Sequence, residues 1–329
     1  MRRRPAVGNA SKFNAGRVSF MELSNRREFL QSAAALPASL AAAQHVLAAK
    51  RDSSPGGEAT LPCISLGKYS ISRLICGANP FNGGSHLSVF VNQEMKAYYT
   101  PEQILETLRR CQQVGINCWQ ASLSRYDLFR RFREEGGQMH FLSIEARDPA
   151  ALKKLAEGGG CIGVAHHGEV TDKLFKEGKL DEVNEYLKRI RDAGFLVGVS
   201  THMPDVVDAI ESKGWDLDYY MTCVYERHRS EEELKKMLGY VPLPPREVYL
   251  MEDPPRMFKA MRQTKRPCLA FKILAAGRLS ERKDWVERAF RETFQSIKPN
   301  DAVIIGIYDR YSDQAGEGAA LVRRFGGMA

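Results

Sequence analysis

Polar side chains that could carry out chemistry stand where short apolar runs of the sequence end. Glu145 ends "MHFLSIE", His166 and His167 end "CIGVAHH", and His202 ends "FLVGVSTH". Carboxylate and imidazole groups are ligands of zinc, manganese and iron. If the runs are parallel strands, their carboxyl ends meet at one rim, and Glu145, His166 and His202 predict a metal site there. Such a divalent metal would polarise a sugar hydroxyl or ketone for isomerisation, epimerisation or elimination.

One further candidate is a lysine. Lys272 lies inside the apolar run "LAFKILA", where an ammonium group must be paired or face a cavity. The two adjacent histidines compete for one place, because side chains alternate along a strand. We therefore expect one of them at the rim and favour His166 over His167.

Several of these residues also have a purely structural alternative. His202 could cap a helix that begins at Met203, and Glu145 could form an ion pair with Arg147 or Lys272. The charged residues 226–229 predict a solvated turn.

The apolar runs alternate with stretches of helical periodicity, which predicts strands and helices in turn. Eight runs are each followed by a helical stretch: 72–78, 116–122, 139–145, 161–167, 195–202, 217–225, 267–275 and 301–307. Eight such units are typical of a (β/α)8 TIM barrel. The segment "CISLGKYSIS" before them predicts an N-terminal β-hairpin that turns at Gly67 and Lys68 and plugs the bottom of the barrel. We predict a single barrel domain over residues 61–329.

Five segments, in order along the chain, resemble the aldo-keto reductase superfamily. They are "ISLGKYSISRLICGANPF", "GINCWQAS", "RDAGFLVGVSTHMPDVVDAI", "ILAAGRLS" and "DAVIIGIYDRYSDQAGEG". The resemblance runs from about residue 63 to the C-terminus. It implies a barrel that reduces a small carbonyl or sugar-type substrate with NADP(H).

The resemblance assigns catalytic positions, but this chain changes some of them. The family's aspartate falls at Gln120, its tyrosine at Tyr126, its lysine at Glu145 and its histidine at His166 or His167. In the family the tyrosine donates a proton to the carbonyl oxygen, and the lysine and aspartate lower its pKa. A carboxylate at position 145 would raise that pKa instead. Three hypotheses follow: an oxidoreductase in which His166 polarises the substrate oxygen and Tyr126 donates the proton, with Lys272 in the site; the metal-dependent enzyme; or a barrel that binds ligand without turnover.

The same resemblance implies residues that hold the cofactor. Ser200 would contact the carboxamide, with Thr201 beside it, and the loop around Gly277 and Arg278 would offer N–H groups and a guanidinium to the pyrophosphate. The adenosine end would lie near the last strand, at Gly306, Arg310, Gln314 and Glu317.

The N-terminus predicts export. Arg26 and Arg27 stand in "SNRREFL", a twin-arginine pattern, ahead of the alanine-rich "FLQSAAALPASLAAA". That run is too mildly apolar to span a membrane, which takes about 20 apolar residues, and small residues at its end suit cleavage. We predict a signal region over residues 1–50 and a linker over 51–60. The twin-arginine translocation machinery is then a partner and the periplasm the destination.

Charge and cysteine content narrow the remaining possibilities. Residues 1–50 hold eight basic and two acidic residues and so carry +6 of the net charge of +8. The nearly balanced remainder gives no electrostatic case for nucleic-acid binding. Seven cysteines without a Cys-x-x-Cys pair do not suggest a disulfide framework.

Overall fold

The computed structural model of the chain describes residues 60–145, 149–245 and 247–327. They belong to one compact unit, residues 59–329. The predicted twin-arginine signal and linker lie outside the described residues. Among the helices that the structure describes, none is long and apolar enough to cross a membrane.

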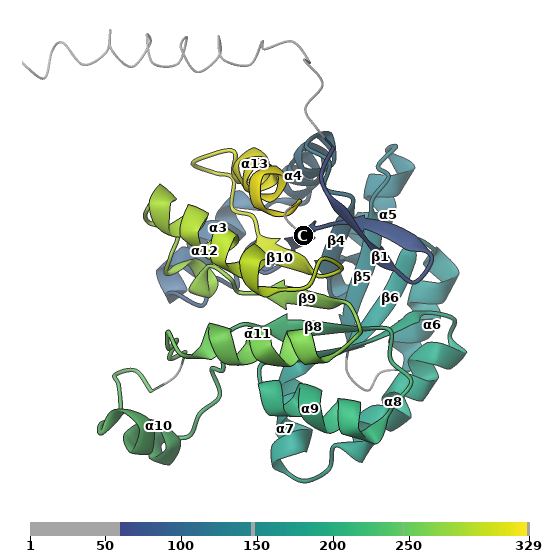
Figure 1. Ribbon diagram of the computed structural model, residues 1–329. Coiled ribbons are helices and arrows are strands. Elements are labelled where there is room, and N and C mark those ends of the chain that lie inside the picture. Colours follow the sequence, from purple (N-terminus) through teal and green to yellow (C-terminus); the bar gives the residue numbers. More distant parts are fainter. Residues whose placement is uncertain (1–59, 146–148, 246, 328–329) are drawn as a thin grey trace, which may run out of the picture. The chain divides into compact units, whose positions relative to one another are not determined.

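Eight parallel strands close into a barrel in the order β10-β3-β4-β5-β6-β7-β8-β9 (Figure 1). The strands are β3 Leu74–Gly77, β4 Cys118–Ala121, β5 His140–Glu145, β6 Cys161–His166, β7 Leu196–Thr201, β8 Tyr219–Cys223, β9 Cys268–Phe271 and β10 Ala302–Gly306. The predicted (β/α)8 barrel is therefore confirmed.

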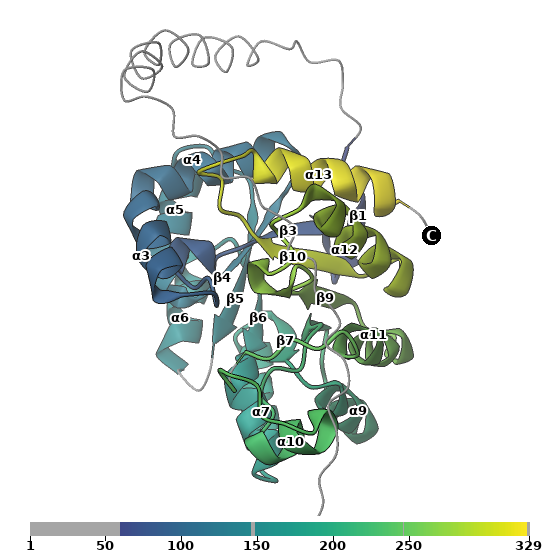
Figure 2. The ribbon, with the colours of Figure 1, turned by 90° about the vertical axis from the view of Figure 1, so that its left-hand side faces the viewer.

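Helices surround the strands (Figure 2). They are α3 Val89–Tyr98, α4 Pro101–Gln113, α5 Tyr126–Glu134, α6 Pro149–Gly158, α7 Gly168–Lys176, α8 Asp181–Asp192, α9 Pro204–Lys213, α10 Glu231–Leu238, α11 Asp253–Gln263, α12 Lys283–Ser296 and α13 Gln314–Phe325. Their starts follow local chemistry. The Thr100 hydroxyl accepts a hydrogen bond from Gln103 N at 3.2 Å, and Pro101 takes the first helical position of α4, where its missing N–H costs nothing.

A β-hairpin covers the N-terminal end of the barrel, as predicted. Strands β1 Cys63–Leu66 and β2 Tyr69–Ser72 pair antiparallel, and Gly67 turns between them with φ +56°. The apolar side chains of Ile64, Leu66 and Ile71 join one buried cluster with residues of the barrel interior. The hairpin thus fills the bottom of the barrel and leaves the opposite end for a site.

Arg73 joins the first barrel strand to the last. Its buried guanidinium donates to the carbonyl of Asp301 at 2.9 Å, to that of Lys298 at 3.1 Å and to that of Gly326. Hydrogen bonds from a charged group are worth about 1.5–3 kcal/mol each, and an orphaned buried partner costs free energy in addition.

We expect Arg73→Met to lower the free energy of unfolding by about 3 kcal/mol or more, because the methionine keeps the apolar stem but removes three charge-assisted hydrogen bonds. Chemical denaturation of the purified protein measures this. Arg282→Met, which removes an exposed ion pair with Asp284, is the matched control and should cost less than about 1 kcal/mol. Equal effects of the two substitutions would contradict the role of Arg73.

Candidate active site

A cavity of about 420 Å³ opens at the carboxyl ends of the strands. Strand ends form its floor, including Gln120, Ser200 and Gly306, and the segments 84–87 and 272–277 form its walls. The C-terminal rim is where barrels of this kind carry their chemistry, so this cavity is the candidate active site.

Lys272, which directly follows β9, lines the cavity. Burial lowers the pKa of its ammonium group, with Arg227 acting in the same direction. Its Nζ lies 3.2 Å from His86 Nε2. A lysine in such surroundings can give and take a proton nearer to neutral pH than an exposed one.

His86 links this lysine to a carboxylate. Its Nδ1 lies 3.2 Å from Glu247 Oε1, and the Tyr249 hydroxyl donates to Glu247 Oε2 at 2.7 Å. Burial alone would raise the pKa of Glu247, but its contacts with His86, Tyr249 and Arg227 outweigh burial and hold that pKa well below its usual range. Lys272, His86 and Glu247 form a chain of polar contacts that reaches into the cavity.

All three residues of this chain adopt the left-handed backbone region, with φ of +61°, +56° and +59° for Lys272, His86 and Glu247. Side chains other than glycine's are strained there, at about 1–3 kcal/mol each. Such strain is typical of sites that the surrounding structure holds in one working geometry.

Arg227 holds the neighbouring part of the rim together. Its side chain is only 9% exposed and bonds both Glu169 and Glu247. Burial raises the pKa of Glu169, but contacts with His228 and Arg227 outweigh that effect and lower it to about 2. The carboxylate is therefore ionised throughout the physiological range.

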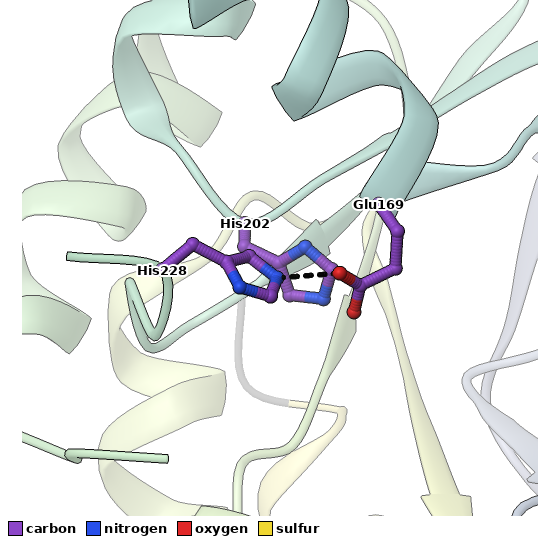
Figure 3. A group of neighbouring side chains, drawn as sticks. All are labelled: Glu169, His202 and His228. Carbon is purple, nitrogen blue, oxygen red and sulfur yellow. Dashed lines mark ion pairs between the residues drawn. The ribbon is translucent and has the colours of Figure 1, made fainter. Parts of the chain in front are cut away.

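His202 is fixed by a carboxylate behind it. Its Nδ1 lies 2.7 Å from Asp172 Oδ2, and Asp172 also accepts from Thr201 Oγ1 at 2.5 Å. Burial lowers the pKa of His202, against the contribution of Asp172. The imidazole lines the cavity and lies beside Glu169 and His228 (Figure 3).

The two adjacent histidines are placed the other way round from our expectation. His166 Nδ1 lies 2.7 Å from Thr171 Oγ1, and its ring packs edge-on against Tyr186 of α8. His167 lines the cavity instead, and burial lowers its pKa. Ala165 belongs to the cluster of the barrel interior and Val164 to the cluster under the helices, so alternation along β6 turns His166 outward and His167 inward.

Of the other predicted catalytic residues, Gln120 lies at the cavity and Glu145 does not. Gln120 lines the cavity. Glu145 is turned toward the loop after β4, where its Oε1 accepts from Leu123 N at 2.6 Å and from Ser143 Oγ at 2.7 Å. The expected metal group of Glu145, His166 and His202 is therefore not assembled, and only His202 of the three lines the cavity.

Tyr126 lies away from the cavity, between α5 and α6. Its buried hydroxyl donates to the carbonyl of Gly159 at 2.7 Å and to that of Leu155 at 3.0 Å. Burial raises its pKa to about 12, whereas a proton donor to a carbonyl needs a lowered value. The expectation that Tyr126 stands at the mouth is corrected by this placement.

The predicted cofactor residues also divide. Ser200, Gly277, Gly306 and Gln314 line the cavity, whereas Thr201, Arg278, Arg310 and Glu317 do not. The Thr201 hydroxyl donates to Asp172. Arg278 stacks on the ring of Tyr249 and donates to backbone carbonyls.

The remaining two predicted cofactor residues have partners on the outer surface. Arg310 pairs with Glu94 at 3.2 Å, and Glu317 accepts from Ser312 Oγ at 3.3 Å.

Several rim residues were not singled out from the sequence. These are His86, Glu169, Asp172, Arg227, His228 and Glu247. Residues 226–229 were expected to be a solvated turn, but Arg227 and Arg229 are buried in ion pairs, the latter with Glu226 and Asp253. The one available signal was the pair of acids at 169 and 172, in the first turns after a histidine-tipped strand.

No family model matches this chain, and no curated protein matches it. Solved structures do. Two from Pseudomonas aeruginosa, named as aldo-keto reductases, are 14% and 16% identical, span 81% and 80% of this chain and 96% of their own, and have TM-scores of 0.52 and 0.51. A glycerol dehydrogenase from Gluconobacter oxydans is 13% identical over 82% of this chain and 90% of its own, with a TM-score of 0.45. At such identities the likeness to the two Pseudomonas aeruginosa structures shows the barrel fold alone.

We expect Tyr126→Phe to cost about 1–2 kcal/mol of unfolding free energy, because the buried Leu155 carbonyl and the Gly159 carbonyl both lose the hydroxyl as a donor. Turnover with any substrate that the wild-type protein converts should stay within twofold. Thermal unfolding and steady-state kinetics on the same preparations test this. A large loss of kcat at unchanged stability would instead return Tyr126 to the catalytic machinery.

Proposed function

We propose that the chain is an oxidoreductase that converts a small carbonyl or sugar-type substrate in the barrel-mouth cavity, with NADP(H) as cofactor and Lys272 as the proton carrier. The observation that carries this is the placement of a half-buried lysine of lowered pKa in the wall of the cavity, with its Nζ 3.2 Å from His86 Nε2. The barrel likeness to proteins named aldo-keto reductases supports the reaction class.

The nicotinamide end of the cofactor fits the residues present. The buried Ser200 Oγ has no hydrogen-bond partner among the described residues and lines the cavity, so it can bond a carboxamide. Gly277, Gly306 and Gln314 line the same space. When bound there, the cofactor supplies or accepts a hydride. Arg278, Arg310 and Glu317 already have partners, so we assign the phosphate end to none of them.

The chain's own residues then perform the proton transfer. Lys272 Nζ faces the cavity and can protonate the substrate oxygen as it gains negative charge. His86 holds Nζ at 3.2 Å and is held by Glu247 in turn, so it positions the ammonium group. This arrangement replaces the tyrosine that lies elsewhere in the fold.

A second candidate function is metal-assisted isomerisation, epimerisation or elimination on a sugar-type substrate. One observation favours it: Glu169, His202 and His228 place three ligand atoms within 4.8 Å of one another at this rim. The cavity residues would then bind the same class of substrate without a nicotinamide.

We expect NADPH-dependent reduction of small aldehydes, ketones or keto-sugars by the wild-type protein to fall at least 100-fold in both Lys272→Met and Lys272→Arg, since acid–base groups contribute about 10²–10⁴-fold. Arginine keeps the charge, but its pKa above about 12 makes it too weak an acid to donate the proton. Lys283→Met, at an almost fully exposed position, is the control and should leave turnover unchanged. Wild-type activity in Lys272→Arg would contradict proton donation by Lys272 and would leave it only the role of a positive charge.

The pH profile adds a readout that a structural role would not move. The ammonium form is the donor, so kcat/KM for reduction should be flat at low pH and fall as pH rises through the pKa of Lys272, below the ordinary lysine value of about 10.4. The groups that face Lys272 are Cys223, Arg227, Glu169, Glu247 and His86.

A wild-type protein that neither quenches NADPH fluorescence nor reduces any of the aldehydes, ketones and keto-sugars contradicts the oxidoreductase proposal. The metal-dependent and ligand-binding hypotheses would then remain.

We also propose that the folded chain is exported to the periplasm by the twin-arginine machinery. Arg26 and Arg27 support this. We expect wild-type protein in the periplasmic fraction of a bacterial host and the double substitution Arg26→Lys, Arg27→Lys in the cytoplasmic fraction. Equal distribution of the two would contradict the signal, with Arg2→Lys, Arg3→Lys as the matched control.

A further inference from the structure

Three side chains from consecutive units of the barrel meet at one side of the cavity mouth. Glu169 lies in the first turn of α7, His202 directly follows β7, and His228 lies in the loop after β8. One ligand atom from each lies within 4.8 Å of the other two. His228 Nε2 is 2.8 Å from Glu169 Oε2, and the two imidazole rings lie edge-to-face with centroids 4.9 Å apart (Figure 3).

Asp172 prepares His202 for a ligand. It lies 2.7 Å from Nδ1 of His202 and also accepts from the backbone N–H of that residue at 3.1 Å. This fixes the tautomer and leaves Nε2 as the ring nitrogen available for coordination. A carboxylate behind an imidazole is the arrangement that orients histidine ligands in metal sites and raises their basicity.

The charges around the cluster leave room for a cation. The carboxylate of Glu169 is bonded by Arg227 and lies 2.8 Å from His228 Nε2. Arg227 is shared between Glu169 and Glu247, so it does not neutralise Glu169 alone. A carboxylate beside two imidazoles is a donor set that suits a divalent ion.

The donor set and its surroundings point to the kind of ion. Two imidazoles and one carboxylate form a set typical of catalytic zinc, in which a fourth position stays open. Glu169 and His202 line the cavity, so that position would face the substrate. Tetrahedral zinc with bonds of about 2.0–2.1 Å needs its ligand atoms about 3.3 Å apart. The ligand atoms lie within 4.8 Å of one another, and Glu169 Oε2 and His228 Nε2 already lie 2.8 Å apart. The side chains of Glu169 and His228 are 42% and 30% exposed, which leaves them room to adjust to this spacing.

We propose that Glu169, His202 and His228 bind a divalent transition-metal ion of the zinc class, with Asp172 as the positioning residue of His202. A bound ion would polarise a carbonyl or hydroxyl oxygen of a substrate in the cavity. The site stands on its own geometry and holds whether or not the chain uses NADP(H).

The test is direct binding of Zn²⁺ to tag-free full-length protein that has been treated with a chelator and dialysed. We expect calorimetry to show one Zn²⁺ per chain. His228→Gln and Glu169→Gln should abolish that site or weaken it at least 100-fold, and Asp172→Asn should weaken it about 10–100-fold. His140→Gln, at the start of β5 and outside the mouth, is the matched control and should bind as the wild type does.

Circular dichroism and thermal unfolding of each variant separate loss of the site from loss of the fold, and visible absorption of the Co²⁺-loaded protein reports the coordination geometry. Absence of a one-to-one Zn²⁺ site in folded wild-type protein, or equal binding by folded His228→Gln, overturns the proposal. Because the assay needs no turnover, its failure is distinct from a failure of the proposed oxidoreductase, which would appear only in the NADPH measurements.

Discussion

The whole rim depends on one ring of backbone hydrogen bonds, which closes where the last strand meets the first. β10 pairs in parallel with β3 from Val303 and Leu74 to Gly306 and Gly77. Because all eight strands run the same way, their carboxyl ends form one circle. His86 and Lys272, which are 186 positions apart in the chain, come within 3.2 Å through this closure. A sheet left open at that seam would separate the chain Lys272–His86–Glu247 into unrelated fragments.

Charge burial at the mouth works against stability, and the structure compensates by pairing. Desolvating an ion costs several kcal/mol unless partners replace the lost water. Arg227 meets this requirement with two carboxylates, and Asp172 meets it with His202 and the adjacent backbone. Among the described residues, those other than glycine with positive φ are His86, Glu247, Lys272, Ala275 and Ala276, which lie in or beside the cavity wall. Strain and buried charge thus gather at one end of an otherwise regular fold, as expected where function rather than stability sets the residues.

The fold could be predicted from the sequence because its signals are periodic. Eight apolar runs, each followed by a helical stretch, could be recognised without knowledge of tertiary contacts, and Gly67 marked the hairpin turn.

The direction in which side chains point was harder to predict. His166 and His167 differ by one residue, and a register irregularity in β6, after which Ala165 faces the barrel interior, decides which of them enters the cavity. The prediction for Tyr126 was wrong for a similar reason. Tyr126 follows the 3-10 turn Leu123–Arg125, and its side chain lies against α6 instead of at the cavity.

The rim partners were beyond sequence patterns because they come from loops whose paths follow no periodicity. His228 reaches Glu169 from 59 positions away, and Glu247 reaches His86 from 161. A charged tetrapeptide such as residues 226–229 has the composition of a solvent-exposed turn, and only the tertiary structure buries its arginines. Lys272 could be inferred, since an ammonium group within an apolar run must find a polar environment.

The hairpin β1–β2 affects how ligands enter and leave the cavity. Its apolar side chains fill the amino end of the barrel, and the cavity opens at the opposite end. In the proposed enzyme, substrate and product then use that opening one after the other. Product release must then precede binding of the next substrate, and product that remains bound competes with new substrate for the cavity.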